Sequence, residues 1–328
     1  MAPAPELRRR LALAVLLLAA LALPPVLAAL GQGYYVGFAA RVLIMAMAAL
    51  SLDLVMGLGG MVSFGHAAFL GIGAYVVGIG SWHVFEGVPL PFGLAGSENA
   101  LVVWPLAMLA AGLAALGIGA VSLRTTGIHF IMITLAFAQM LFYLAGGLKT
   151  YGGDDGITLY SRSSLGGLNL SDPFTFYYLC LGLLAAVLAA FLRLADSRFG
   201  MVLKGVRDNE RRMRALGFPT YRYKLAAFTL SGAVCGLAGA LLANASEFAG
   251  PAYMGWQRSG ELLVMVVLGG MGSLVGAVLG AAALLILEEA LAGLTQHWQL
   301  LLGALLLLLA LSARRGLWGW LGGGGRHG

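Results

Sequence analysis

The amino-acid sequence predicts an all-α fold, a polytopic bundle of about ten transmembrane helices. Of its 328 residues, 60% are hydrophobic and only 10% are charged, whereas soluble domains have on average about 25% charged residues. The apolar residues form runs close to the roughly 20 residues that a helix needs to cross a bilayer. These observations exclude a disordered chain, a nucleic-acid-binding protein and a soluble enzyme. We expect residues 1–328 to form a single transmembrane domain.

The first apolar run, Leu11–Leu30, follows Arg8, Arg9 and Arg10. It has the pattern of a signal peptide cleaved after Ala28, but a signal anchor is favoured because the run is long enough to span the membrane. Arginines beside a span stay in the cytoplasm, so we expect a cytoplasmic N-terminus. The next five predicted spans are Val36–Gly57, Val62–Trp82, Ala100–Leu123, Thr126–Gly146 and Phe174–Leu194.

After these six spans the chain reaches its only long charged segment, residues 196–224, with eight Lys and Arg side chains. An even number of spans returns the chain to the cytoplasm, where basic loops belong. The loops His83–Asn99 and Leu148–Pro173 then lie outside. Glu261–Gly270 is too short to span alone, so a re-entrant or tilted half-helix, with nine spans in all, is the alternative. The last four predicted spans and the basic tail, also on the cytoplasmic side, are Leu225–Ser246, Glu261–Gly270, Ser273–Leu294, Trp298–Ser312 and residues 313–328.

The sequence carries no motif that predicts catalysis or metal binding. A nucleotide-binding P-loop requires Gly-Lys-Ser/Thr, and the only lysine followed by Ser or Thr is Lys149, which Leu148 precedes. The five histidines are scattered. Gly152–Gly156 lacks the alternating ligands and the final Glu of a calcium loop, so we interpret it as an external turn. We therefore predict no catalytic residue, no cofactor and no metal, and expect a transport subunit without its own ATP site.

The charged segment is the strongest functional signal. Gly217 and Pro219 form a stop signal, which predicts a short helix from about Val206 to Leu216. The pairs Asp208/Arg212 and Glu210/Arg214 have the spacing of ion pairs along a helix. Two interpretations remain open from the residues alone. The helix is either solvated or resting on anionic lipid headgroups, or it docks on a cytoplasmic partner through an apolar edge and its arginines.

Two glycine-rich strings interrupt the predicted spans. GLGGMVSFGHAAFLGIGAY starts at Gly57, and LGGMGSLVGAVLGA starts at Leu268. Small residues allow close helix packing, and glycine pairs also break helices and expose backbone groups, as transporters use them. Both strings contain Leu-Gly-Gly-Met. Because the predicted topology places both on the same side of the membrane, they do not indicate an inverted repeat.

Several polar side chains lie within or near the ends of apolar spans, where ionisable groups are costly unless they face a cavity or a partner. Asp53 is the only moderate candidate for the deep carboxylate of a proton-coupled carrier, and a structural, hydrogen-bonded role is favoured for it. We interpret Arg41, near the outer end of its span, as a side chain that extends to the interface. The remaining polar residues of this kind are Ser63, His66, Thr134, Gln139, Glu288 and Glu289.

At these residues the sequence resembles the branched-chain amino acid ABC transporter permeases of the Liv type, and more the M-type subunit than the shorter H-type. The resemblance rests on the string from Gly57, on GIHFIMITLAFAQM from Gly127, on residues 196–228 with RDNE and ALG, and on ELLVMVVLGGMGSLVGAVLGA from Glu261. Three positions depart from the family pattern: Asp53 stands where Asn is common, His129 where an aromatic residue is usual, and Tyr151 where a small neutral residue is frequent.

The resemblance implies a subunit of an inner-membrane importer for leucine, isoleucine and valine. Its implied partners are a sister permease, two cytoplasmic ATP-binding subunits and an external substrate-binding protein. Related systems that import urea, amides or other amino acids are the alternative, as is a self-sufficient secondary carrier or channel. The residues implied for ATPase coupling are Arg207, Asn209, Glu210, Arg214, Ala215, Leu216 and Gly217. Those we expect to line the translocation path are Ser63, His66, Thr134 and Gln139.

Overall fold

The computed structural model describes residues 5–89, 96–167, 169–295, 297–312 and 316–321, and most of these residues are helical. Seven helices in this part of the chain are long and apolar enough to cross a membrane. They are α2 (Gly33–Asp53) with the π-helical turn η1 (Leu54–Leu58), α3 (His66–Glu86), α4 (Ala100–Ser122), α5 (Ile128–Gly147), α6 (Pro173–Asp196), α8 (Thr220–Ser246) and α10 (Val275–Ala292).

The other three predicted spans are helical too, as α1 (Pro5–Ala29), α9 (Trp256–Gly269) and α11 (Trp298–Ser312). α9 has 14 residues and α11 has 15, fewer than the roughly 20 that a full crossing requires. The polytopic helical fold is therefore confirmed, whereas the number of about ten spans stays a prediction.

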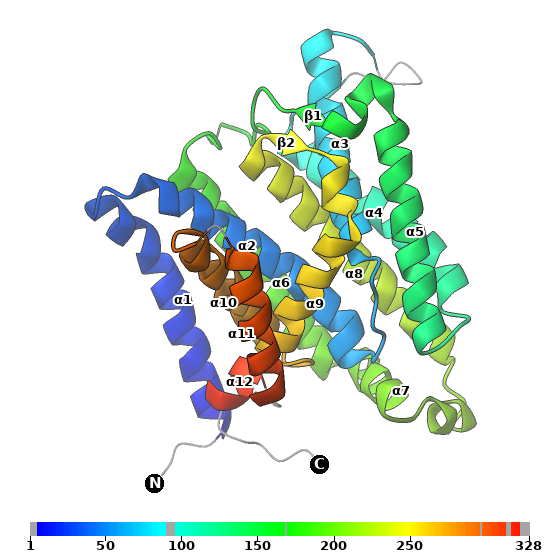
Figure 1. Cartoon of the computed structure of the whole chain (residues 1–328). Helices are drawn as coiled ribbons and strands as arrows, with labels where there is room; N and C mark the ends of the chain where they lie inside the picture. Colours follow the sequence, from blue (N-terminus) through cyan, green and yellow to red (C-terminus); the bar gives the residue numbers. More distant parts are fainter. Residues whose placement is uncertain (1–4, 90–95, 168, 296, 313–315, 322–328) are drawn as a thin grey trace.

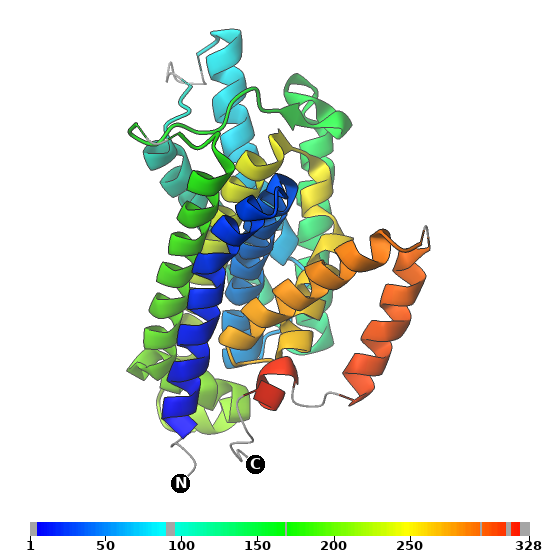
Figure 2. The ribbon, with the colours of Figure 1, turned by 90° about the vertical axis from the view of Figure 1, so that its left-hand side faces the viewer.

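The helices run between two ends of the bundle (Figures 1 and 2). The start of α1, the charged helix α7 (Arg198–Ala215) and the short helix α12 (Gly316–Leu321) lie at one end. At the opposite end lie the paired strands β1 (Ile157–Thr158) and β2 (Phe248–Ala249), which join the loops after α5 and α8. The 3-10 turns η3 (Lys149–Tyr151) and η4 (Gly153–Asp155) lie in the same loop as β1, and η5 (Pro251–Met254) follows β2. The basic segment and the two predicted outer loops thus lie at opposite ends, as the predicted topology requires.

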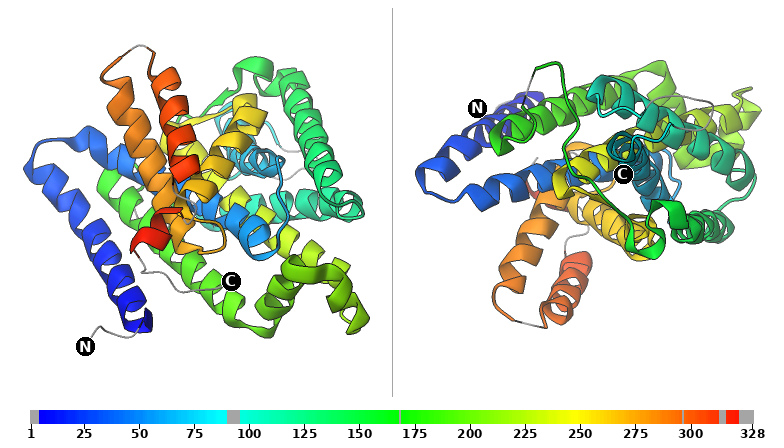
Figure 3. Two further views of the ribbon diagram at one scale, coloured as in Figure 1. Left: turned by 60° about the horizontal axis from the view of Figure 1, so that its bottom comes forward. Right: turned by 90° about the horizontal axis from the view of Figure 1, so that it is seen from above.

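The core forms around α2 and α8. Every residue from Leu43 to Gly59 is buried, because α2 packs against α6, α8, α9 and α10. Figure 3 shows α6 on one side of α2 and α10 on the other. α8 packs against α3 and α4 through small residues. A Cβ atom added at Gly73 or Gly239 would collide with a backbone carbonyl of the facing helix, so glycine is what permits these helices to approach so closely.

Candidate functional site

The charged segment folds as α7, but the helix starts earlier than the sequence predicted. α7 begins at Arg198 and not near Val206, because the Ser197 hydroxyl accepts a hydrogen bond from Gly200 N over 3.4 Å and caps the first turn. The helix is interrupted at Asn209, whose φ and ψ of −159° and 94° are not helical. The Asn209 side chain accepts a hydrogen bond from Arg212 N over 3.0 Å and so starts a second helical segment.

This interruption decides which predicted ion pairs form. Glu210 and Arg214 lie in the same segment, and Arg214 Nη2 lies 2.6 Å from Glu210 Oε1. Asp208 and Arg212 lie on opposite sides of Asn209, so they lose the helical spacing that would bring them together. Asp208 instead accepts a hydrogen bond from Arg207 Nε over 3.1 Å. One predicted pair is therefore confirmed, and the other is wrong.

The predicted end of the helix is confirmed. Gly217 has a φ of +88°, a left-handed conformation that glycine adopts without strain. Phe218 N donates to Met213 O over 3.1 Å and Gly217 N donates to Arg214 O over 2.9 Å, which is the hydrogen-bond pattern of a glycine-terminated helix. The chain then turns directly into α8.

Glu210 holds the turn between α7 and α8 together. Its carboxylate accepts hydrogen bonds from Lys224 Nζ over 2.6 Å, Arg214 Nη2 over 2.6 Å and the Thr220 hydroxyl over 3.1 Å. Burial raises the pKa of Glu210, but these donors outweigh burial and leave the pKa below its ordinary value. Sequence reasoning missed Lys224 and Thr220 as members of this cluster, and the signal that could have found the first of them is a lysine at the start of an apolar span.

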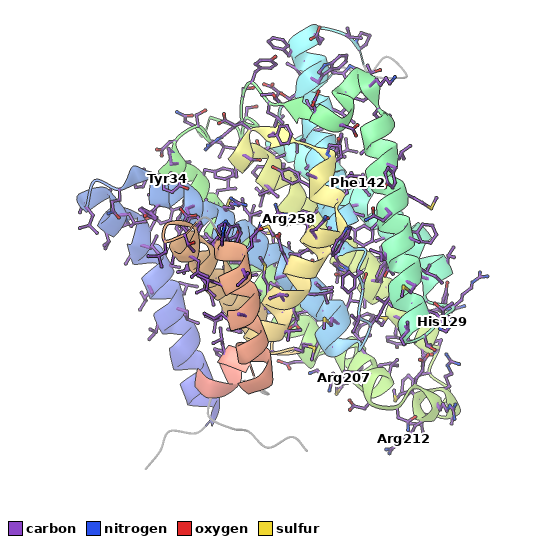
Figure 4. The ribbon with its side chains drawn as sticks, in the orientation of Figure 1. Tyr34, His129, Phe142, Arg207, Arg212 and Arg258 are labelled. Atoms are coloured by element: carbon purple, nitrogen blue, oxygen red, sulfur yellow. The ribbon has the colours of Figure 1, made fainter. Side chains whose placement is uncertain are left out.

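We call α7 and its turn into α8 (residues 198–224) the elbow. The tip of the elbow presents apolar and basic side chains to the surroundings. Leu216 is 64% exposed and Phe218 is 37% exposed, and Arg211 and Arg212 are exposed beside them. Arg212 projects from the end of the molecule, beyond all the apolar helices (Figure 4). Exposed large apolar residues surrounded by charges are typical of a surface that binds another protein.

Arg207 links α7 to the first glycine-rich break. Its Nη1 donates a hydrogen bond to Gly57 O over 2.8 Å. The stem of the side chain lies so close to Gly60 that a Cβ added there would stand 2.7 Å from Arg207 Cγ. The backbone is not helical from Gly59 to Gly65, and α3 begins at His66. The predicted span starting at Val62 therefore began four residues too early, because an apolar run does not reveal where a helix is broken.

The second break lies directly beside the first. α9 ends at Gly269, Gly270 and Gly272 have positive φ values of 107° and 80°, and α10 begins at Val275. The buried Asp53 carboxylate joins the two, because Oδ1 accepts from Gly272 N over 2.7 Å and Oδ2 accepts from Leu274 N over 2.8 Å. Both Leu-Gly-Gly-Met strings thus meet at the α7 end of the bundle. We call Arg207, Gly57, Asp53 and Gly272 the glycine junction.

Three of the four residues predicted to line the path lie around the first break. Ser63, His66 and Thr134 are fully buried within the chain. Ser63 Oγ accepts from Gly65 N over 3.2 Å, Thr134 Oγ1 accepts from Phe64 N over 3.3 Å, and His66 Nε2 is hydrogen-bonded to Ser231 Oγ over 2.6 Å. Their polar atoms satisfy the interrupted backbone and tie α3 to α5 and α8. Gln139 lies farther along α5 and is not part of this group.

These features define a polytopic helical membrane protein of the transport-permease class, with two broken helices that meet beside a charged elbow at one end of the bundle. The chain belongs to the family described as the permease component of the branched-chain amino acid transport system, whose model matches residues 34–311. The predicted resemblance to this family is therefore confirmed. A chain of this family is a transport component of an ABC-type system and not by itself a catalytic enzyme.

Known relatives agree with this assignment. The chain is 30% identical over 310 residues to the high-affinity branched-chain amino acid transport system permease protein LivM of Salmonella typhimurium strain LT2, covering 86% of this chain and 69% of the relative. It is 30% identical over 296 residues to LivM of Escherichia coli strain K12, covering 82% of this chain and 66% of the relative.

A more distant similarity is confined to one part of the chain. Over 120 residues the chain is 34% identical to the autoinducer 2 import system permease protein LsrC of Escherichia coli O9:H4 strain HS, which covers 34% of this chain and 35% of the relative. No solved structure gives a significant match.

Proposed function

We propose that this chain is the membrane-spanning permease subunit of an ATP-driven importer for leucine, isoleucine and valine in the bacterial inner membrane. Membership of the permease family and the identity to two LivM proteins over most of the chain support this substrate class. The observation that carries the coupling mechanism is the contact of α7 with the glycine junction. Arg207 is hydrogen-bonded to Gly57 at the first break, and Asp53 of the same helix is hydrogen-bonded to Gly272 at the second, so the elbow contacts the first broken helix directly and the second through Asp53.

In this proposal α7 is the coupling helix that inserts into a cytoplasmic ATP-binding subunit. Leu216 and Phe218 supply the apolar contact, and Arg211 and Arg212 pair with acidic groups of the partner. The Glu210 cluster fixes α7 to α8, so the elbow moves as one piece when the ATPase subunits close. Arg207 passes this movement to Gly57, and the spans rearrange between two states that differ in the side open to substrate.

The remaining partners complete the proposal, which membership of the permease family supports. A sister permease completes the translocation path, two ATP-binding subunits supply the energy, and an external binding protein delivers the substrate to the loops at the end opposite α7. Ser63, His66, Thr134 and Gln139 stay the proposed path residues, reached only when the first break opens. Import of urea, amides or another amino acid is the alternative within the same mechanism.

A pull-down of the tagged full chain from its native membrane in mild detergent, followed by mass spectrometry, tests the assembly. We expect a second permease and ATP-binding subunits in stoichiometric amounts. Reconstitution of that complex with its binding protein then tests the substrate, through ATP-dependent uptake of radiolabelled leucine with urea as the comparison. A chain that is recovered alone, and that transports in response to an ion gradient without ATP, would refute the proposal in favour of a secondary carrier.

A further inference from the structure

Two arginines line one pocket in the half of the bundle away from α7. Arg41 of α2 and Arg258 of α9 both border a cavity of about 360 Å³ between α2, α8 and the start of α9. Figure 4 shows Arg258 and Tyr34 in this region, well separated from Arg207 and Arg212 at the other end. Charged side chains within apolar helices are costly, so each needs a partner or a ligand.

The two guanidinium groups differ in their partners. Arg258 Nη1 lies 2.6 Å from Glu261 Oε2, so its charge is balanced within α9. None of the ion pairs among the described residues includes Arg41. Glu288 of α10 is close enough to interact with both arginines, and Tyr34, which borders the pocket, donates a hydrogen bond to Glu289 over 3.3 Å. Neither carboxylate borders the pocket itself, where the charged groups are the two guanidinium groups. Arg41, which belongs to none of these ion pairs in the described part of the chain, is therefore the donor that we assign to an anion.

The other walls of the pocket divide into a polar and an apolar part. The hydroxyls of Ser246 and Tyr253 lie 2.8 Å apart beside the arginines. Phe38, Met45 and Leu242 supply the apolar wall. Small-molecule sites typically combine an apolar lining with a few placed polar groups, in pockets of roughly 300–1,000 Å³. A ligand with one anionic end and one aliphatic end fits both parts.

We propose that this pocket binds a small aliphatic carboxylic acid, with its carboxylate on Arg41 next to Arg258 and its hydrocarbon chain against Phe38, Met45 and Leu242. The ligand that we assign to it, an α-amino acid with an aliphatic side chain, rests on the proposed function. In the predicted topology the pocket lies on the external half of the bundle, where it would receive the substrate released by the binding protein. Neither the family match nor the relatives assign a site to these residues.

Direct binding to the purified full chain in phosphatidylcholine nanodiscs tests the proposal. The probe is radiolabelled leucine in a scintillation proximity assay, with isovalerate and isopentylamine as competitors that retain only the carboxylate or only the amine. We expect saturable binding that isovalerate displaces and isopentylamine does not. Arg41→Gln should weaken binding at least about tenfold, as expected for one lost charge-assisted hydrogen bond. Arg193→Gln is the matched control, because Arg193 is an exposed arginine in the last turn of α6, outside the pocket. This variant should bind leucine as the unaltered chain does.

A second variant, Gly37→Phe, keeps both arginines and adds a bulky side chain at the edge of the pocket. Gly37 borders the pocket, and a Cβ added there meets no heavy atom within 4 Å, so the backbone can carry a side chain at this position. We expect the variant to reduce leucine binding while the chain stays monodisperse. Binding unchanged in both Arg41→Gln and Gly37→Phe, or no saturable binding of either leucine or isovalerate, would overturn the proposal.

The two proposals fail in different ways. ATP-dependent leucine uptake by the complete system, together with leucine binding that ignores Arg41, would remove the pocket and leave the importer intact. Isovalerate binding that requires Arg41, without leucine uptake by the reconstituted system, would retain a carboxylate pocket and refute the branched-chain importer.

Discussion

Replacing Arg207 with Ala tests whether α7 acts on the broken helices through a single contact. The substitution removes the hydrogen bond from Nη1 to Gly57 O, which spans 2.8 Å, and the side-chain stem that covers Gly60. A hydrogen bond with a charged donor contributes about 1.5–3 kcal/mol. Because the Arg207 side chain is 41% exposed, solvent screening lowers the expected contribution to about 1 kcal/mol. That change alters a conformational equilibrium by roughly fivefold.

The assay compares transport with ATP hydrolysis in the same proteoliposomes. We expect Arg207→Ala to lower the leucine taken up per ATP hydrolysed by roughly fivefold. Copurification of the ATP-binding subunits should not change, because Leu216 and Phe218 at the docking tip are untouched. Arg198→Ala is the matched control, since it removes an exposed arginine of the same helix that lies outside both the glycine junction and the proposed docking tip. An uptake-to-hydrolysis ratio for Arg207→Ala equal to that of Arg198→Ala would refute transmission through this contact. Loss of copurification in Arg207→Ala alone would make Arg207 a docking residue instead.

Three further predictions concern the same region. Asp53→Asn should still insert but should lower the free energy of unfolding by about 1–3 kcal/mol, because the amide NH₂ would face the backbone N–H of either Gly272 or Leu274. Thermal unfolding in detergent measures this change, with Asp196→Asn as the control. Equal unfolding midpoints for the two variants would contradict the prediction. Because the pKa of Glu210 is lowered in the folded chain, its carboxylate should stabilise the elbow fully above the ordinary Glu pKa of about 4.3, and this stabilisation should be lost as the pH falls below that value. Hydrogen exchange of residues 198–224 measures this. Protection that already falls between pH 7 and 6 would argue against the prediction. Gly217→Pro should abolish uptake in a chain that still inserts, because proline cannot adopt the φ of +88° found at this position. Gly217→Asn should retain most uptake, because asparagine tolerates this conformation. Equal uptake in both variants would show that the helix end is not needed for coupling.

The spans were predictable from composition, but their interruptions were only partly so. Long apolar runs placed a helix over each predicted span. The glycines at Gly59 and Gly60 located the first break, yet hydropathy could not show that Val62 to Gly65 stay outside α3, because an apolar segment buried in protein need not be helical. The start of α7 was missed for a similar reason: Ser197 is a helix cap, but the prediction gave more weight to the charged residues after Val206.

The contacts of the proposed coupling residues could not be predicted from the sequence. The family resemblance named Arg207 and Glu210, and both occupy the elbow. Their contacts with Gly57 and Lys224 join residues far apart in the sequence, and no local periodicity reveals such a pairing. Arg41 shows the same limit for a single residue. The sequence suggested a side chain that extends to the membrane interface, whereas in the structure it borders a pocket together with Arg258, which is distant in sequence.

The glycine junction explains why the two Leu-Gly-Gly-Met strings need not be an inverted repeat to serve one purpose. A Cβ added at Gly57 would collide with both the Asp53 carboxylate and the Gly272 backbone, so the two breaks already stand at the closest approach that a backbone permits. Closely packed elements do not deform continuously but change between discrete arrangements. A displacement of Arg207 therefore cannot be absorbed by compression between the breaks. A push on Arg207 toward the junction should instead move α2 and the α9–α10 turn together, as the coupling role that we propose for α7 requires.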